Sequence, residues 1–148
     1  MEVNDRSEIF RQYFDRIASN RKKYRGKRAY YWNDITRSVS YFIHQDYSVL
    51  EVGSGTGELL NDLQAKRKVG IDFSEQMVQI AREEFRDVEF HVMDAAKITL
   101  TEKFDVIILS NLIGFLPDIQ RVFAELNKVT WQCIFALKNK CRYQSSPI

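Results

Sequence analysis

Three glycines that alternate with small polar residues give the sequence its clearest chemical feature, at residues 51–57. They are Gly53, Gly55 and Gly57; a short apolar run precedes them, and leucines at helical spacing follow them. Glycine permits backbone conformations that other residues avoid, and it lets a ligand approach bare N–H groups. A strand, a glycine loop and a helix N-terminus in this order favour a negatively charged or electron-rich ligand.

The spacing of the glycines separates several classes of nucleotide site. A dinucleotide fingerprint needs its third glycine at position 58, where this chain has Glu58, and no Gly-Lys-Ser/Thr sequence of a P-loop follows. The carboxylates of Glu51 and Glu58 would repel a diphosphate. The loop therefore predicts a ligand that has an adenosine and a cationic amino group but no phosphates.

Strand and helix patterns alternate through the middle of the chain at intervals of roughly 20 residues. Short apolar runs predict strands at 48–52, 68–72, 88–92 and 104–110. Such alternation is typical of right-handed crossover units. It predicts an α/β fold, with a Rossmann-like, open and mainly parallel sheet that has helices on both faces.

Four polar residues mark the ends of these predicted strands. Glu51, Asp72, Asp94 and Ser110 each lie at or near the carboxyl end of a different strand. Open parallel sheets bind ligands at that edge. We therefore expect the four side chains to lie around one binding site.

Together these features resemble the class I S-adenosylmethionine-dependent methyltransferases. The Glu-x-Gly-x-Gly-x-Gly loop, the acid at Asp72, the Asp94-Ala95 pair and the apolar strand at 104–110 match that family in order and spacing. The resemblance covers roughly residues 8–128. It implies S-adenosylmethionine as cofactor, S-adenosylhomocysteine as product, and an N-terminal helical cap over the cofactor.

The resemblance also implies a role for each matching residue. The loop backbone would hold the methionine part, with Glu51 near the loop or the amino group, and Asp72 would accept hydrogen bonds from the ribose hydroxyls. Phe73 and Met77 would flank the adenine, and the Asp94-Ala95 pair would bind its polar edge. The predicted cofactor-binding residues are Glu51, Gly53, Ser54, Gly55, Gly57, Asp72, Phe73, Met77, Asp94, Ala95, Ser110 and Asn111.

Methyl transfer from a sulfonium is an in-line displacement, which a protein promotes by aligning donor and acceptor and by excluding water. A general base is optional. His44 and His91 are candidates, but their places before a strand and within one favour structural roles, so we assign no catalytic residue. Ser110 and Asn111 would face the methyl-transfer side.

The acceptor is constrained only by what the sequence lacks. Residues 110–113 do not form the Asn-Pro-Pro-Tyr arrangement with which the family methylates DNA bases. A small-molecule, lipid or glycan acceptor is therefore favoured over nucleic acid. The alternative hypothesis is a truncated S-adenosylmethionine-binding or interaction module without its own catalysis.

The first 47 residues predict a helical cap in two pieces, in which Tyr13, Phe14 and Tyr31 are candidate lid residues. Between the two pieces, residues 21–28 have Lys or Arg at six of eight positions. This basic run would bind an anionic substrate or RNA, or would be a solvated connection between helices.

The C-terminal end departs from the family pattern. Residues 131–137 predict a fifth strand, which ends a core at 48–137, and residues 138–148 predict a tail. The usual further helix and antiparallel strands are missing, which indicates a fragment of a longer parent chain, with a further domain, or a natural truncation. An uncovered edge strand invites a homodimer.

The composition fits one soluble domain of 148 residues, with 45% hydrophobic and 28% charged residues. No apolar run reaches the roughly 18 residues of a membrane span, and the N-terminus lacks a signal-peptide pattern. We therefore expect a cytoplasmic protein. Cys133 and Cys141 form no disulfide framework or metal-site pattern, so we expect reduced thiols and no metal.

Overall fold

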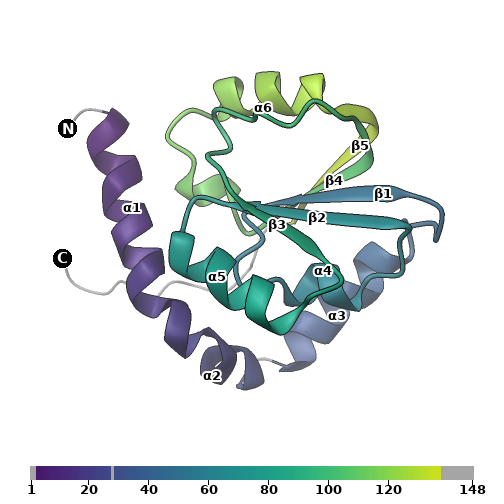
Figure 1. Ribbon diagram of the computed structural model, residues 1–148, viewed down its shortest axis with the longest axis horizontal. Coiled ribbons are helices and arrows are strands. Elements are labelled where there is room, and N and C mark those ends of the chain that lie inside the picture. The colour runs from purple at the N-terminus through teal and green to yellow at the C-terminus, as the bar shows by residue number, and fades with distance from the viewer. Residues whose placement is uncertain (1–2, 28, 138–148) are drawn as a thin grey trace.

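The computed structural model describes residues 3–27 and 29–137, which form a parallel β-sheet flanked by helices (Figure 1). The five strands lie in the order β3-β2-β1-β4-β5, and every neighbouring pair is parallel. The predicted Rossmann-like α/β fold is confirmed, while the predicted tail at 138–148 lies outside the described residues. The strands are β1 (Ser48–Val52), β2 (Arg67–Asp72), β3 (Glu89–Val92), β4 (Phe104–Ser110) and β5 (Thr130–Leu137).

Helices cover both faces of the sheet. Helix α6 (Ile119–Lys128) lies on one face, and α3 (Ala29–Ser40), α4 (Glu58–Asp62) and α5 (Glu75–Glu84) lie on the other (Figure 1). A short 3-10 helix, η2 (Ile113–Phe115), stands between β4 and α6. The crossover helices therefore hide the sheet from solvent on both sides.

The continuous apolar runs of the inner strands follow from this double burial. In β1, Val49 packs into the cluster with α3, α4 and α5, whereas Leu50 packs into the cluster on the α6 side. In β4, Ile108 packs into the cluster with α3, α4 and α5, and Ile107 packs into the cluster on the α6 side. All four side chains have 0% exposure.

The strand order reverses beside β1, because β2 pairs with one side of this strand and β4 with the other. In open parallel sheets the crevice at such a switch point is the usual ligand site. The glycine loop follows β1, and Ser110 and Asn111 end and follow β4. The topology thus brings two groups of predicted site residues to one place.

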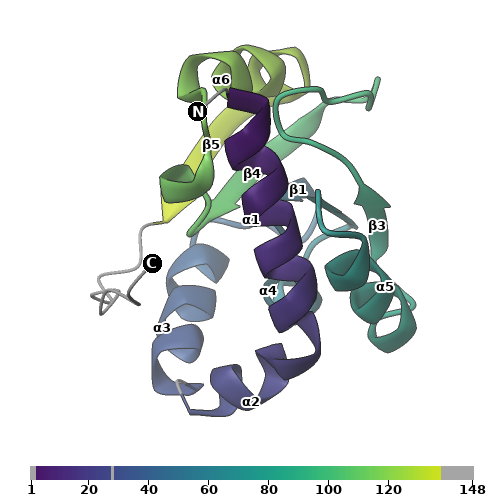
Figure 2. The ribbon, with the colours of Figure 1, turned by 90° about the vertical axis from the view of Figure 1, so that its left-hand side faces the viewer.

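The N-terminal cap contains three α-helices instead of the two predicted. Helix α1 (Val3–Ile17) continues through η1 (Ala18–Asn20) into α2 (Arg21–Gly26), and the chain then turns back into α3 (Figure 2). Helix α1 packs against α5. Most of the basic run is therefore the short helix α2, since Lys and Arg are good helix formers.

Three local features are not evident from the sequence pattern. Pro117 precedes helix α6 rather than starting it, because Asp118 is the N-cap and its side chain accepts from the Arg121 N–H at 3.0 Å. Leu63 is extended and lies just after α4, although it is buried. Val92 is 48% exposed because β3 is an edge strand.

Two features of the fold bear on partners. Strand β5 ends the strand order, so within the described part of the chain its outer edge has no strand partner. A homodimer through this edge stays a prediction. Among the helices of residues 3–27 and 29–137, none combines the length and apolarity that crossing a membrane requires.

Candidate functional site

The glycine loop is held against β2 by its own backbone. The N–H groups of Gly53 and Ser54 both donate to the Ile71 carbonyl oxygen, at 2.8 and 3.0 Å, and the Gly57 N–H donates to the Ser54 carbonyl oxygen at 3.0 Å. The expectation of bare N–H groups is wrong at these positions, because the loop uses the donors to hold its own shape. Its three glycines have positive φ angles, of 75° at Gly53, 55° at Gly55 and 87° at Gly57.

The carboxylate of Asp72, at the end of β2, binds the backbone of the glycine loop. Its Oδ2 accepts from the Gly55 N–H and its Oδ1 accepts from the Ser74 N–H, both at 2.9 Å. Burial is the largest influence on this group and raises its pKa, whereas the two N–H donors and the nearby Arg21 guanidinium act to lower it. Each oxygen keeps capacity for a further hydrogen bond, so the oriented carboxylate is suited to bind hydroxyl groups.

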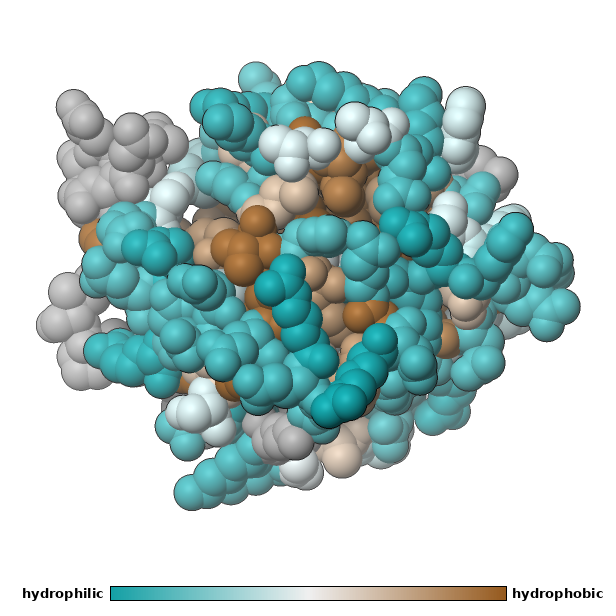
Figure 3. All heavy atoms as spheres, viewed as in Figure 1, coloured by the Kyte–Doolittle hydropathy of each residue, from teal (hydrophilic) through white to brown (hydrophobic). Residues whose placement is uncertain are grey.

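Asp72 lies in the wall of a largely apolar cleft at the carboxyl edge of the sheet. The space-filling view shows apolar atoms recessed among polar side chains on one face of the molecule (Figure 3). The cleft is lined by Ser7, Val52, Gly53, Asp72, Phe73, Met93, Asp94, Ala95, Leu112, Phe115, Leu116 and Pro117.

The structure brings five of the predicted cofactor-binding residues together in this lining. They are Gly53, Asp72, Phe73, Asp94 and Ala95, which follow or end three adjacent strands. Their convergence follows from the parallel arrangement, since the carboxyl ends of β1, β2 and β3 meet at one edge. The predicted polar groups and the predicted aromatic wall thus face the same space.

Five other predicted residues lie around the cleft without lining it. Glu51 and Met77 are only 2% and 1% exposed. Met77 is buried because it belongs to the inward face of α5, one turn after the helix start. Ser54, Gly55 and Gly57 build the loop.

Strand β4 ends in two polar residues beside the switch point. Ser110 Oγ and Asn111 Oδ1 are shielded from solvent, and neither has a hydrogen-bond partner within the part of the chain that the structure describes. Asn111 also has a φ of 56°, a left-handed conformation that Asn tolerates better than most residues. Buried polar atoms without partners are costly, so this pair is suited to contact a bound molecule.

The sequence analysis missed the other wall of the cleft. Leu112, Phe115, Leu116 and Pro117 supply it from the segment that connects β4 to α6. The one sequence feature that could have indicated this wall is that apolar residues follow directly after a buried strand. Ser7, from the cap, had no distinguishing pattern around it.

Aromatic side chains connect the cap to the cleft. The Phe14 ring lies 5.9 Å from that of Phe73 and 5.0 Å from that of Phe115, measured between centroids. Tyr13 stacks edge-on against Phe14 at 5.3 Å, and Tyr31 packs instead against the core cluster with α3. Of the three candidate lid residues, Phe14 therefore contacts the cleft walls directly.

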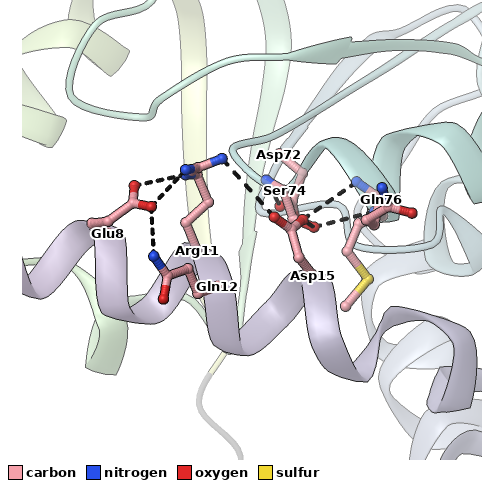
Figure 4. Close-up of polar contacts among 8 residues, drawn as sticks. Glu8, Arg11, Gln12, Asp15, Asp72, Ser74 and Gln76 are labelled. Atoms are coloured by element: carbon pink, nitrogen blue, oxygen red, sulfur yellow. Dashed lines mark hydrogen bonds and ion pairs between the residues drawn. The ribbon is translucent and has the colours of Figure 1, made fainter.

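A polar contact fastens the cap to α5 (Figure 4). Asp15 Oδ1 accepts from the Ser74 hydroxyl at 2.6 Å and from the Gln76 N–H at 3.4 Å. Ser74 is the N-cap of α5, and its Oγ accepts from the Met77 N–H at 3.2 Å. One carboxylate thus joins α1 to the helix that follows Asp72.

We expect Asp15→Ala to lower the free energy of unfolding by about 1–2 kcal/mol, because Ser74 loses a charge-assisted hydrogen bond that joins the cap to the core. Urea unfolding followed by circular dichroism measures this change. Asp34→Ala is the control, since the Asp34 side chain is 48% exposed and, among the described residues, pairs with Arg37 of its own helix; it should cost less than about 0.5 kcal/mol. Equal losses in the two variants would contradict the fastening role of Asp15.

Both histidines lie outside the cleft lining. His91 pairs with Glu89 on the edge strand at 2.7 Å, and His44 lies 3.3 Å from Asp46 before β1. These contacts support the structural roles expected for them. In the described ranges, no group of His, Cys, Asp and Glu side chains is arranged to hold a metal ion.

Comparisons with known proteins bear on this geometry. A family model described as "Methyltransferase domain" matches residues 49–132. A malonyl-[acyl-carrier protein] O-methyltransferase of Bacillus cereus is 31% identical over 125 residues, covering 76% of this chain and 42% of that protein. A phosphatidylethanolamine N-methyltransferase of Cereibacter sphaeroides is 36% identical over 89 residues, covering 55% of this chain and 44% of that protein.

A solved structure shares the fold. It comes from Thermotoga maritima and is described as an S-adenosylmethionine-dependent methyltransferase and possible histamine N-methyltransferase. It matches with a TM-score of 0.69 and 24% identity, covering 85% of this chain and 56% of that chain. The present chain thus spans less than half the length of the two curated relatives and just over half of this structure.

Proposed function

Because the chain belongs to the methyltransferase-domain family, we propose that it binds S-adenosylmethionine in the cleft beside Asp72 and transfers the methyl group to an acceptor. The family match confirms the resemblance found in the sequence. One observation carries the proposal: a buried carboxylate at the end of β2, oriented by the Gly55 and Ser74 N–H groups, lies in the wall of an apolar cleft.

The residues present fit an adenosine. The two ribose hydroxyls would donate to the Asp72 oxygens, which already have the required orientation. Phe73 would cover one face of the adenine, with Leu112 and Leu116 among the apolar residues available to the other. Asp94 would accept from the adenine amino group near the Ala95 backbone. Burial of an apolar ring among these walls is favourable at roughly 25 cal/mol per Å².

The rest of the cofactor would extend along the switch point. The glycine loop, with Ser54 and Glu51 behind it, would hold the methionine part. Ser110 Oγ and Asn111 Oδ1 offer hydrogen-bonding atoms that the protein itself leaves unpaired within its described residues. The methyl-transfer side would then lie near the end of β4.

When bound, S-adenosylmethionine supplies a methyl group on a positively charged sulfur. The chain must then align the methyl donor with the acceptor and exclude water from between them. Phe14 of the cap would help to exclude water, because its ring contacts both Phe73 and Phe115 in the cleft walls. Correct orientation alone is worth up to roughly 7–11 kcal/mol, so the mechanism requires no assigned general base.

For the acceptor we propose a small molecule, a lipid, a glycan or an acyl group on a carrier. The two curated relatives support this range, since one is named for a carrier-bound malonyl acceptor and the other for phosphatidylethanolamine. Their names differ even in the acceptor atom, oxygen in one and nitrogen in the other. Family membership therefore does not select one acceptor.

Titration calorimetry with S-adenosylmethionine and S-adenosylhomocysteine tests the cofactor site of the chain. We expect saturable binding of both with one site per chain. Transfer of a labelled methyl group to a panel of carboxylate, amine and hydroxyl acceptors then separates an enzyme from a binding module. No heat with either compound would reject the proposed function.

A further inference from the structure

A cation from the cap rests on the glycine loop. Arg21 is the first residue of α2, and its Nη2 lies only 3.0 Å from the place where a Cβ on Gly55 would be. Its Cζ lies 3.7 Å from the same point. The guanidinium therefore fills the space that the missing side chain of Gly55 leaves open.

Arg21 is half-buried. Within residues 3–27 and 29–137, no hydrogen bond or ion pair holds it, whereas Arg11 pairs with Glu8 and Arg67 pairs with Glu102. Its charge is close enough to Asp72 to oppose the rise that burial causes in the pKa of that carboxyl. A partly desolvated charge without a partner is unfavourable, which indicates that Arg21 is positioned for an anion.

The loop itself has few donors left for such an anion. The N–H groups of Gly53, Ser54 and Gly57 donate to backbone carbonyls, and that of Gly55 donates to Asp72. The acids Glu51 and Asp72 add negative charge nearby. An anionic group above this loop therefore needs a cation from another element.

Resting on the function proposed above, we propose that Arg21 binds the α-carboxylate of the methionine part of the cofactor. A guanidinium presents parallel N–H donors that match a carboxylate in a two-bond arrangement. The cap, rather than the glycine loop, would then recognise this end of the ligand. Because Asp72 would hold the ribose, the loop would lie between two charged contacts, one from the core and one from the cap.

A pair of ligands isolates this contact. S-adenosylhomocysteine carries the carboxylate, whereas 5′-methylthioadenosine keeps the adenosine and the sulfur but lacks the amino-acid part. We would measure the Kd of both for the full chain and for Arg21→Gln, Arg21→Lys and Lys23→Gln. Lys23 is the matched control, since it is an exposed cation in the same helix.

For Arg21→Gln we expect roughly tenfold to hundredfold weaker binding of S-adenosylhomocysteine, the usual effect of losing a charged pair of hydrogen bonds. Binding of 5′-methylthioadenosine should change less than about twofold. Arg21→Lys should restore part of the loss, and Lys23→Gln should leave both ligands unchanged.

Three results would overturn the inference. Unchanged binding of S-adenosylhomocysteine in Arg21→Gln would remove Arg21 from the site. Equal weakening of both ligands would make Arg21 a structural support of the loop. Failure of the unsubstituted chain to bind either ligand would instead reject the proposed function itself, and the inference with it.

Discussion

Asp72→Asn is expected to weaken binding of S-adenosylhomocysteine by more than tenfold. The asparagine keeps the shape of the side chain but loses the charge, and hydrogen bonds to charged groups contribute about 1.5–3 kcal/mol each. Its amide nitrogen also cannot accept from the Gly55 or the Ser74 N–H, so one of these donors loses its partner. Titration calorimetry measures the affinity, and circular dichroism shows whether the variant is folded.

Asp87→Asn makes the same chemical change at an exposed position after α5 and serves as the control. We expect its affinity to match that of the unsubstituted chain. An unchanged affinity in Asp72→Asn would remove Asp72 from the site, whereas a loss shared by both variants would point to an effect of net charge.

Because Asp72 is buried, its contribution to the stability of the fold depends on pH in a predictable direction. Its pKa in the folded protein lies above the unfolded value, so its contribution to stability is fully present below the unfolded pKa and is lost as pH rises through the folded pKa. Ligand binding changes in the opposite direction, because ribose hydroxyls need the ionised carboxylate as acceptor.

Affinity for S-adenosylhomocysteine should therefore fall as the solution is acidified, and the fall should begin above the ordinary aspartate pKa of about 3.9. Asp72→Asn should lack this component of the pH profile. The same profile in both proteins would assign the titration to another group.

The core of this site was predictable because it depends on local chemistry. The glycine pattern at residues 51–57 predicts the turn there. Asp72 comes at the end of a buried apolar run, which is typical of an inner strand. Parallel pairing of β1 with β2 then brings the two segments together without further information. The family match confirms the resemblance that these residues carry.

The cap contacts were not predictable, because they join side chains far apart in the sequence. Asp15 meets Ser74 across 59 positions, and the contact between Arg21 and Gly55 depends on how α2 docks on the loop. Helical periodicity places Met77 on an apolar face, yet it does not tell whether that face meets a ligand or the core. The structure places it in the core at 1% exposure.

Gly57→Ala is the substitution for which we expect the largest loss of stability, about 2–5 kcal/mol. Gly57 has a φ of 87°, and a left-handed conformation costs a residue with a side chain roughly 1–2 kcal/mol. The new Cβ would also lie 2.4 Å from Phe90 Cζ and 3.3 Å from Ala81 Cβ. Overpacking of this kind costs typically 1–3 kcal/mol. Urea unfolding measures the total.

Phe90 cannot move away from the new methyl group, because its ring is also fitted against Gly70. A Cβ at Gly70 would lie 2.6 Å from Phe90 Cδ1, and the ring is only 3% exposed. The double variant Gly57→Ala with Phe90→Leu should therefore lose less stability than the sum of its single substitutions. Gly114→Ala is the control, with nothing within 4 Å of its Cβ; it should cost less than about 0.5 kcal/mol. Strict additivity in the double variant would show that backbone strain alone, not the Phe90 contact, requires glycine at this turn.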